Sequence, residues 1–377
     1  MKSIICLLLI FKKTTAWTAS PTKATPSVGR VSAGPINISA LGCGTWSWGN
    51  RLLWDYDPSQ DEEIYNAYRA VRDAGVSVFD TADSYGTLDL NGRAEILLGQ
   101  FERRYLSEKE GGNDDEETGF FSFLGGSKVV TPNPQQVATK FAPYPWRILR
   151  SNMVSAAKES LKRLEQDKLS LAQLHWSTAN YQPFQERALW EGIADVYDEG
   201  LCEAVGVSNY GPLQLSKIKE YLDERNVPLA TAQIQYSLMT YKDCRDMNES
   251  CDNANCRLIS YSPLCLGLLT GKYNLDNLPR NGNPRRQLFR ELLPGAQDLL
   301  KTLELIAKEV DKSQSQVAIN WAVCKGTVPI PGARNLKQAE ENLGAVGWSL
   351  SDAMVDELDR AALSLGKPMI QNVFQTK

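Results

Sequence analysis

Short apolar segments alternate with amphipathic helical segments along most of this chain, and no other sequence feature limits the fold as much. Ile64, Ala67, Tyr68 and Val71 recur at helical spacing just before the apolar segment 76–80. The order repeats, and the expected strands are 76–80, 137–140, 169–175, 204–208, 230–235, 257–262 and 327–331. Such alternation predicts an α/β fold of parallel strands joined by right-handed helical crossovers.

The number of these units separates a closed barrel from an open sheet. An eighth strand is expected without a firm position, and the glycine-spaced segment 41–45 is a candidate for a hairpin at a barrel floor. About eight units over about 320 residues suit a (β/α)8, or TIM, barrel. An open dinucleotide-binding sheet would carry a third glycine in segment 42–47, and segment 267–273 has its glycines one residue too close for a phosphate loop. We therefore expect one TIM barrel over residues 35–377.

The first 34 residues do not follow this pattern. The apolar run 4–11 is far shorter than the ~20 residues that span a bilayer, so no membrane segment is expected. The stretch 12–34 contains Thr, Ser, Lys and Pro but no acidic residue. A signal-like run followed by a transit-like stretch opening near Trp17 resembles the bipartite presequences of algae with secondary plastids. We expect residues 1–34 to be a targeting presequence to a plastid (chloroplast); secretion, or a cytoplasmic protein with a disordered tail, is the alternative.

A second segment interrupts the alternation between the expected helix 94–104 and the strand 137–140. It includes the charged stretch 111–117 and is poor in core residues. We interpret it as a solvated, disordered insertion near residues 105–133.

Composition excludes several classes of function. Six of the 41 basic residues precede Asp55, the first acidic residue, so 35 basic residues face 45 acidic ones in the remainder. An acidic body argues against nucleic-acid binding. The eight cysteines form no C-x-x-C pair and the single histidine lies far from them, so no metal site is expected.

Polar side chains follow the expected strands at their carboxyl ends, where a barrel places its active site. His175 is the only histidine, and Tyr85 lies five residues after Asp80. Considered alone, a histidine at a strand end is more often structural, and a tyrosine beside a glycine is more often a loop aromatic. The strand-end residues are Asp80, Lys140, His175, Ser208, Asn209, Gln233, Tyr261 and Arg334.

The order of these motifs resembles the aldo-keto reductases, from roughly residue 38 to 350. The motifs are Phe79-Asp80-Thr81-Ala82-Asp83-Ser84-Tyr85-Gly86, Ala138-Thr139-Lys140-Phe141, Gln173-Leu174-His175-Trp176, Gly206-Val207-Ser208-Asn209-Tyr210, Gln233, Tyr261-Ser262-Pro263-Leu264, Ile330-Pro331-Gly332-Ala333-Arg334, Gln338 and Glu341-Asn342. Trp46-Ser47-Trp48-Gly49 and the run 346–350 are similar to the chloroplast aldo-keto reductases of plants.

The resemblance implies a catalytic tetrad of Asp80, Tyr85, Lys140 and His175 that reduces an aldehyde or ketone to an alcohol with NADPH. Tyr85 would donate the proton, and Lys140 would lower the pKa of this phenol from ~10. Asp80 would hold Lys140, because a lone buried cation is costly, and His175 would orient the carbonyl. The alternative for Asp80 and Lys140 is a structural salt bridge between neighbouring strands.

The resemblance also implies a set of cofactor-binding residues. Tyr261 would stack on the nicotinamide, and Ser208, Asn209 and Gln233 would hold its carboxamide. Arg334 would bind the 2′-phosphate, which favours NADPH over NADH, unless it is only a solvated loop cation. Gln338, Glu341 and Asn342 would lie near the adenine, and the remaining cofactor residues would be Thr45, Trp46, Ser262, Pro263, Leu264 and Gly267.

Two other functions remain as alternatives. Potassium-channel β subunits share this fold, tetrad and NADPH but act mainly as redox-sensing binding partners, whereas the acid-free leader favours an organelle enzyme. A degenerate barrel that only binds nucleotide is disfavoured by the complete tetrad. Tryptophans near the expected mouth favour small flat or apolar carbonyls as substrates; they are Trp46, Trp48, Trp54, Trp146 and Trp176.

Overall fold

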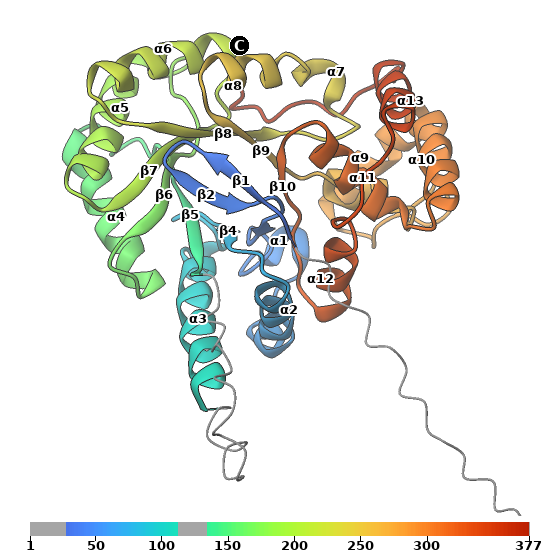
Figure 1. Ribbon diagram of the computed structural model, residues 1–377, viewed down its shortest axis with the longest axis horizontal. Coiled ribbons are helices and arrows are strands. Elements are labelled where there is room, and N and C mark those ends of the chain that lie inside the picture. The colour runs from blue at the N-terminus through green and yellow to red at the C-terminus, as the bar shows by residue number, and fades with distance from the viewer. Residues whose placement is uncertain (1–27, 112–133, 377) are drawn as a thin grey trace, which may run out of the picture.

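The structure is a computed structural model that describes residues 28–111 and 134–376, and its centre is a barrel of eight parallel strands (Figure 1). The first and last strands meet through a parallel bridge between Gly44 and Gly332, and Gly42 N donates to Pro329 O at 2.9 Å. The sheet therefore closes on itself, and the expected TIM barrel is confirmed. In order around the barrel the strands are β3 Cys43–Gly44, β4 Val78–Asp80, β5 Gln136–Phe141, β6 Leu169–Leu174, β7 Cys202–Ser208, β8 Leu229–Gln235, β9 Arg257–Tyr261 and β10 Val328–Ile330.

The eighth strand is β3, inside the segment 41–45 that was a candidate for a floor hairpin, so that assignment is wrong. A Cβ atom on Gly44 would lie 2.8 Å from Ile330 O, and one on Gly42 would lie 2.8 Å from Ile330 Cγ2. Glycine at both positions lets β3 approach β10 closely enough to complete the barrel. The same glycines removed the apolar signature by which the other strands were predicted.

The hairpin at the floor lies earlier in the chain. β1 (Arg30–Ala33) pairs with β2 (Ile36–Ser39) in antiparallel register. Ala33, Ile36 and Ile38 are buried together with side chains from the amino-terminal halves of the barrel strands. The expected presequence boundary at residue 34 falls within this hairpin, so the folded barrel begins no later than Arg30. Residues 1–27 lie outside the described residues.

Helices cover the outside of the barrel, with at least one in every crossover (Figure 1). Local sequence sets their starts: Ser313 and Gln316 form a reciprocal capping box at the start of α11, and Pro183 occupies the first turn of α5. The helices are α1 Arg51–Trp54, α2 Asp61–Asp73, α3 Arg93–Gly111, α4 Arg150–Leu164, α5 Pro183–Asp198, α6 Pro212–Glu224, α7 Tyr241–Cys244, α8 Met247–Asn253, α9 Pro284–Leu292, α10 Gln297–Glu309, α11 Gln314–Cys324, α12 Leu336–Leu343 and α13 Asp352–Leu363. In the described parts of the chain, no helix is long and apolar enough to cross a membrane.

Helix α3 is longer than expected and corrects the start of the insertion. Residues 105–111 continue the helix, and Tyr105 is buried with its hydroxyl donating to Asp73 at 2.9 Å. Arg104 and Glu108 pair with each other on the exposed side of the same helix. The charges thus mark a solvated helix face, and the prediction of disorder from residue 105 is wrong as far as Gly111. Residues 112–133 lie outside the described residues.

Candidate active site

The four expected catalytic residues come from three neighbouring strands. Asp80 is the last residue of β4, Lys140 is in β5, and His175 follows β6 directly. Tyr85 lies in the loop after β4. Because β4, β5 and β6 are adjacent and parallel, their carboxyl ends bring all four side chains to one mouth of the barrel.

Lys140 and Asp80 form a buried ion pair at the base of this group. Lys140 Nζ donates to Asp80 Oδ1 at 2.6 Å and to Thr81 O at 2.8 Å, and both charged side chains are almost fully buried. Burial lowers the pKa of Lys140, and the neighbouring carboxylate of Asp80 opposes that shift. Gln233 Nε2 donates to the other Asp80 oxygen at 2.6 Å. Gln233 therefore supports Asp80 in this structure, although it was expected to hold the nicotinamide carboxamide.

Tyr85 lies above the ion pair. The ammonium of Lys140 is 4.9 Å from the centre of the Tyr85 ring, and the rings of Tyr85 and His175 are 5.7 Å apart at 70°. Burial raises the pKa of Tyr85 well above 10, and the nearby Asp80 carboxylate adds to the shift. The net direction is thus opposite to the lowering expected from Lys140, because burial is the largest effect on this phenol. The phenol is therefore held in its protonated form, which is the form that can donate a proton.

His175 is a neutral imidazole in this site. Burial lowers its pKa well below 6.5, and the charge of Lys140 lowers it further. The Ser84 hydroxyl lies 3.4 Å from Nδ1. A neutral imidazole has one N–H donor, and its ring faces Tyr85, so this donor and the Tyr85 hydroxyl can serve one small polar group on the same side of the mouth.

Several expected cofactor residues gather beside His175. Asn209 Nδ2 donates to His175 O at 3.0 Å and to Ser208 Oγ at 3.1 Å. The Tyr261 hydroxyl donates to Asn209 Oδ1 at 2.8 Å. Ser262 continues from Tyr261 with a φ of 51° and leads through Pro263 and Leu264 into the 3-10 helix Cys265–Thr270, which contains Gly267. Ser208, Asn209 and Tyr261 thus form one side of the mouth next to the tetrad.

The other expected cofactor residues lie on the side where the barrel closes. Thr45 donates through its backbone N and its hydroxyl to Asp80 O, at 2.9 and 3.0 Å. Trp46 is partly exposed with its ring edge-on to Trp54. Gln338 Oε1 accepts from Arg334 N at 2.9 Å, and Asn342 Nδ2 donates to Gly332 O at 3.2 Å. Glu341 is turned away and accepts from Ser313.

Arg334 contacts the backbone and ring of Trp54. Its Nη1 donates to Trp54 O at 2.7 Å, and its guanidinium lies 5.5 Å from the indole. Burial lowers the pKa of Arg334, and the positive charge of Arg285 lowers it further. Among residues 28–111 and 134–376, no carboxylate is within ion-pair distance of Arg334. The side chain is partly buried against Trp54, which differs from the solvated loop cation given above as the alternative.

Arg285 is a candidate functional residue that the sequence reasoning missed. Its guanidinium lies 4.4 Å from the Trp54 ring and donates to Leu266 O at 3.2 Å. Within the described parts of the chain it too makes no ion pair. Asn283 caps the first turn of α9, with Pro284 at the first helical position. That cap-and-proline pattern was the available signal, because it places Arg285 at a helix start.

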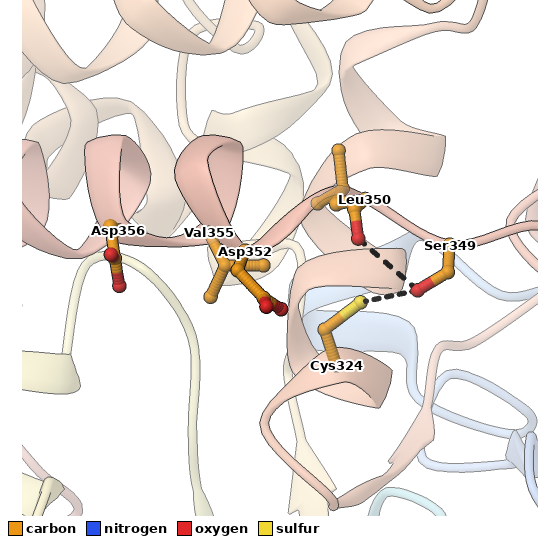
Figure 2. A pocket seen from close by; sticks show the side chains of 6 residues that line it. All are labelled: Cys324, Ser349, Leu350, Asp352, Val355 and Asp356. Atoms are coloured by element: carbon orange, nitrogen blue, oxygen red, sulfur yellow. Dashed lines mark hydrogen bonds between the residues drawn. The ribbon is translucent and has the colours of Figure 1, made fainter.

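A surface hollow of about 260 Å³ lies elsewhere on the molecule (Figure 2). It is lined by Cys324, Ser349, Leu350, Asp352, Val355 and Asp356, with the Cys324 thiol 3.4 Å from the Ser349 hydroxyl. Cys324 ends α11, which leads into the amino end of β10. This hollow therefore lies at the end of the barrel opposite to the tetrad. No cluster of residues that could hold a metal occurs in the part of the chain that the structure describes.

Comparison with known proteins identifies the family and supports the fold. Residues 40–363 match the model of the aldo/keto reductase family. The chain is 48% identical over 349 residues to the chloroplastic pyridoxal reductase of Arabidopsis thaliana, covering 92% of this chain and 90% of that protein. A glycerol dehydrogenase from Gluconobacter oxydans has the same fold, with a TM-score of 0.70 and 23% identity over 94% of this chain and all of that one. An aldo-keto reductase of the silkworm Bombyx mori, solved with NADPH, has a TM-score of 0.64 and 23% identity over 89% and 88% of the two chains.

The family match spans most of the chain, and the resemblance to plant chloroplast enzymes is confirmed by the Arabidopsis relative. The chain belongs to the aldo/keto reductase family, a family of NADP-dependent oxidoreductases.

Proposed function

We propose that this protein uses NADPH to reduce a small aldehyde or ketone to an alcohol, with Tyr85 as the proton donor. The observation that carries the proposal is the buried Lys140–Asp80 pair beneath Tyr85, with the His175 ring facing the same phenol. These groups occupy the mouth of the barrel, where the ends of three strands meet.

Each residue has one task in this reaction. The bound dihydronicotinamide supplies a hydride to the carbonyl carbon. His175 donates a hydrogen bond to the carbonyl oxygen, and Tyr85 transfers its proton to that oxygen as negative charge develops there. Lys140 stabilises the phenolate that remains, and a buried charge interaction of this kind is stronger than in water. Asp80 keeps Lys140 charged and in place.

The residues beside the junction of β3 and β10, where the barrel closes, fit the phosphorylated end of NADPH. Arg285 and Arg334 both lie against Trp54, and the indole Nε1 is buried without a hydrogen-bond partner. Two guanidinium groups without carboxylate partners form a binding site for a phosphate. We assign the 2′-phosphate to this pair, the carboxamide to Ser208 and Asn209, and the stacking face of the nicotinamide to Tyr261.

For the substrate we propose pyridoxal or an aromatic aldehyde of similar shape. The relative from Arabidopsis is named for pyridoxal. In this chain, Trp176 stacks on Phe374 with ring centres 4.4 Å apart, and it lies beside His175. A flat aromatic wall next to the carbonyl-orienting residue favours flat substrates.

The relative is also chloroplastic, which supports a plastid location directed by the residues before the barrel. Fluorescence of residues 1–34 fused to a reporter protein tests that location. A purely cytosolic signal would contradict it.

The test of the function is NADPH oxidation by the purified protein with pyridoxal, sugar-derived aldehydes and lipid-peroxidation aldehydes. Turnover on the order of 10 per second, a typical enzyme rate, with at least one of them is expected, with pyridoxal the best. The channel-β type of redox sensor would instead bind NADPH and turn over none of these compounds at such a rate.

A further inference from the structure

A buried carboxylate outside the tetrad connects two loops of the barrel mouth. Glu186, in the first turn of α5, is 6% exposed and forms no ion pair among the described residues. It instead accepts five hydrogen bonds. Oε2 accepts from Thr178 N at 2.5 Å and Thr178 Oγ1 at 2.9 Å, and Oε1 accepts from Trp190 Nε1 at 2.9 Å, the Tyr210 hydroxyl at 2.8 Å and Gln214 Nε2 at 3.0 Å. A carboxylate is costly to bury, so five donors around one group indicate a site built for it.

The two oxygens of Glu186 serve different loops. Oε2 holds Thr178, three residues after His175, in the loop that follows β6. Oε1 holds Tyr210, the residue after Asn209, in the loop that follows β7. Burial and the Glu186 carboxylate raise the pKa of Tyr210 well above 10, which keeps its hydroxyl a donor.

The same two loops also meet at the reaction centre. Asn209 Nδ2 donates to His175 O at 3.0 Å. The contacts therefore form a closed ring, from His175 along the chain to Thr178, through Glu186 to Tyr210, and from Asn209 back to His175. A loop that is held at two points cannot slide past its neighbour, so Glu186 fixes the position of His175 relative to Asn209.

We propose that Glu186 is a positioning residue for the reaction, which holds His175 toward the carbonyl oxygen and Asn209 toward the nicotinamide carboxamide. The proposal rests on the proposed function, because it assigns those two tasks to His175 and Asn209. Small displacements of orienting groups slow a reaction strongly, since the reacting atoms must meet at a defined distance and angle.

The test is Glu186→Gln, which preserves the size of the side chain but turns an NH2 group toward the donors of one loop. We expect the single-turnover rate of NADPH oxidation to fall about 10- to 100-fold, and the Kd for NADPH to rise. Tyr210→Phe removes one donor and leaves the other four, so it tests the same bridge with a smaller change to the buried site. We expect it to change both quantities in the same direction by about fivefold, as for one hydrogen bond.

The matched control is Glu102→Gln. Glu102 also accepts from a buried tyrosine hydroxyl, that of Tyr68, and pairs with Arg72, but it lies between α2 and α3 in the outer layer. It should lower stability and leave the single-turnover rate and the NADPH Kd unchanged. Wild-type values of both quantities in folded Glu186→Gln and Tyr210→Phe would overturn the proposal. If the wild-type protein reduces no carbonyl, the proposed function fails, and the Kd for NADPH alone decides for or against the role of Glu186.

Discussion

The ammonium of Lys140 lies 4.9 Å from the centre of the Tyr85 ring while it donates a 2.6 Å hydrogen bond to Asp80. The lysine charge is therefore neutralised before a proton leaves Tyr85, and burial keeps the phenol protonated. In the proposed reaction, the same lysine stabilises the phenolate that remains after the transfer, because a charge interaction is stronger in a buried site. The arrangement favours the transition state over the resting state, which is how binding groups accelerate a reaction.

The first prediction concerns this proton. Tyr85→Phe removes the hydroxyl and keeps the ring, so we expect kcat for carbonyl reduction to fall by on the order of 100-fold or more, with little change in NADPH affinity. Steady-state kinetics and a fluorescence titration with NADPH measure the two effects. Tyr68→Phe, a buried tyrosine of the outer layer, is the control and should retain the wild-type kcat. Retained reduction in the Tyr85 variant would remove the proposed mechanism.

The second prediction is a pH dependence of stability that originates at Asp83. This buried carboxylate accepts from Ala142 N at 3.1 Å and pairs with Arg147 at 2.6 Å. Burial, opposed by Arg147, raises its pKa to about 6. The folded protein therefore binds this proton more tightly than the unfolded chain, where the pKa is near 3.8. The Asp83 contribution to the free energy of unfolding must then decrease as the pH rises from about 4 to about 6.

Asp83→Asn cannot take up the proton and isolates this contribution. Denaturant unfolding at pH 5 and pH 7 should show that the stability of wild type relative to the variant falls by roughly 1 kcal/mol over this range. Identical pH dependence in the two proteins would show that Asp83 is already charged at pH 5. His175, whose pKa is held well below 6.5 by burial, lowers the stability of both proteins as the pH falls below about 6.5, so its contribution cancels in this comparison.

The sequence predicted the barrel, and grouped three of the four expected catalytic residues, for a physical reason. In a parallel barrel, the residue at the carboxyl end of each apolar strand faces a common mouth, so Asp80, Lys140 and His175 could be grouped without coordinates. Tyr85 lies in a loop, and the spacing of apolar residues does not predict the conformation of a loop. Only the resemblance to a family identified this residue as a candidate. The structure then placed its ring between Lys140 and His175.

What the sequence did not predict depends on contacts between distant segments. β3 is a strand of only two residues, and its bridge to the other end of the barrel joins Gly44 to Gly332, 288 positions away. No local pattern reveals such a strand. Arg285 becomes a candidate only because Trp54 lies beside it in the folded chain. The direction of the Tyr85 pKa shift depends on the burial of the phenol in the folded protein, which the spacing of the motifs does not reveal.

The third prediction concerns the hairpin at the floor. A chain that begins at residue 28 retains β1, whereas one that begins at residue 35 loses it, along with the buried Ala33 and the hydrogen bond from Arg30 to Gln136 at 3.2 Å. We expect the shorter chain to unfold about 5 °C or more below the longer one. Because the tetrad lies at the opposite end of the barrel, kcat should be the same in both. Equal thermal stability would mean that the hairpin contributes little to the fold.

The last prediction concerns the choice of cofactor. Arg334 and Arg285 approach Trp54 with guanidinium groups that have no carboxylate partner in the described chain. Their charges disfavour each other, since Arg285 contributes to the lowered pKa of Arg334, and a bound 2′-phosphate would relieve that repulsion. NADH has only a hydroxyl at this position. We therefore expect a preference for NADPH of about 2–4 kcal/mol, or roughly 30- to 1,000-fold in Kd.

Each arginine should contribute to that preference. Arg334→Ala should remove most of it and Arg285→Ala part of it, in both cases by weakening NADPH with little change for NADH. Arg290→Ala, on an exposed position of the same helix as Arg285, is the matched control and should leave both affinities unchanged. The Kd values of all four proteins are measured by protein fluorescence, because both guanidinium groups lie near the Trp54 indole, at 4.4 and 5.5 Å. Equal wild-type affinity for NADPH and NADH would show that the pair does not bind the 2′-phosphate, and the assignment of the tetrad would be unaffected.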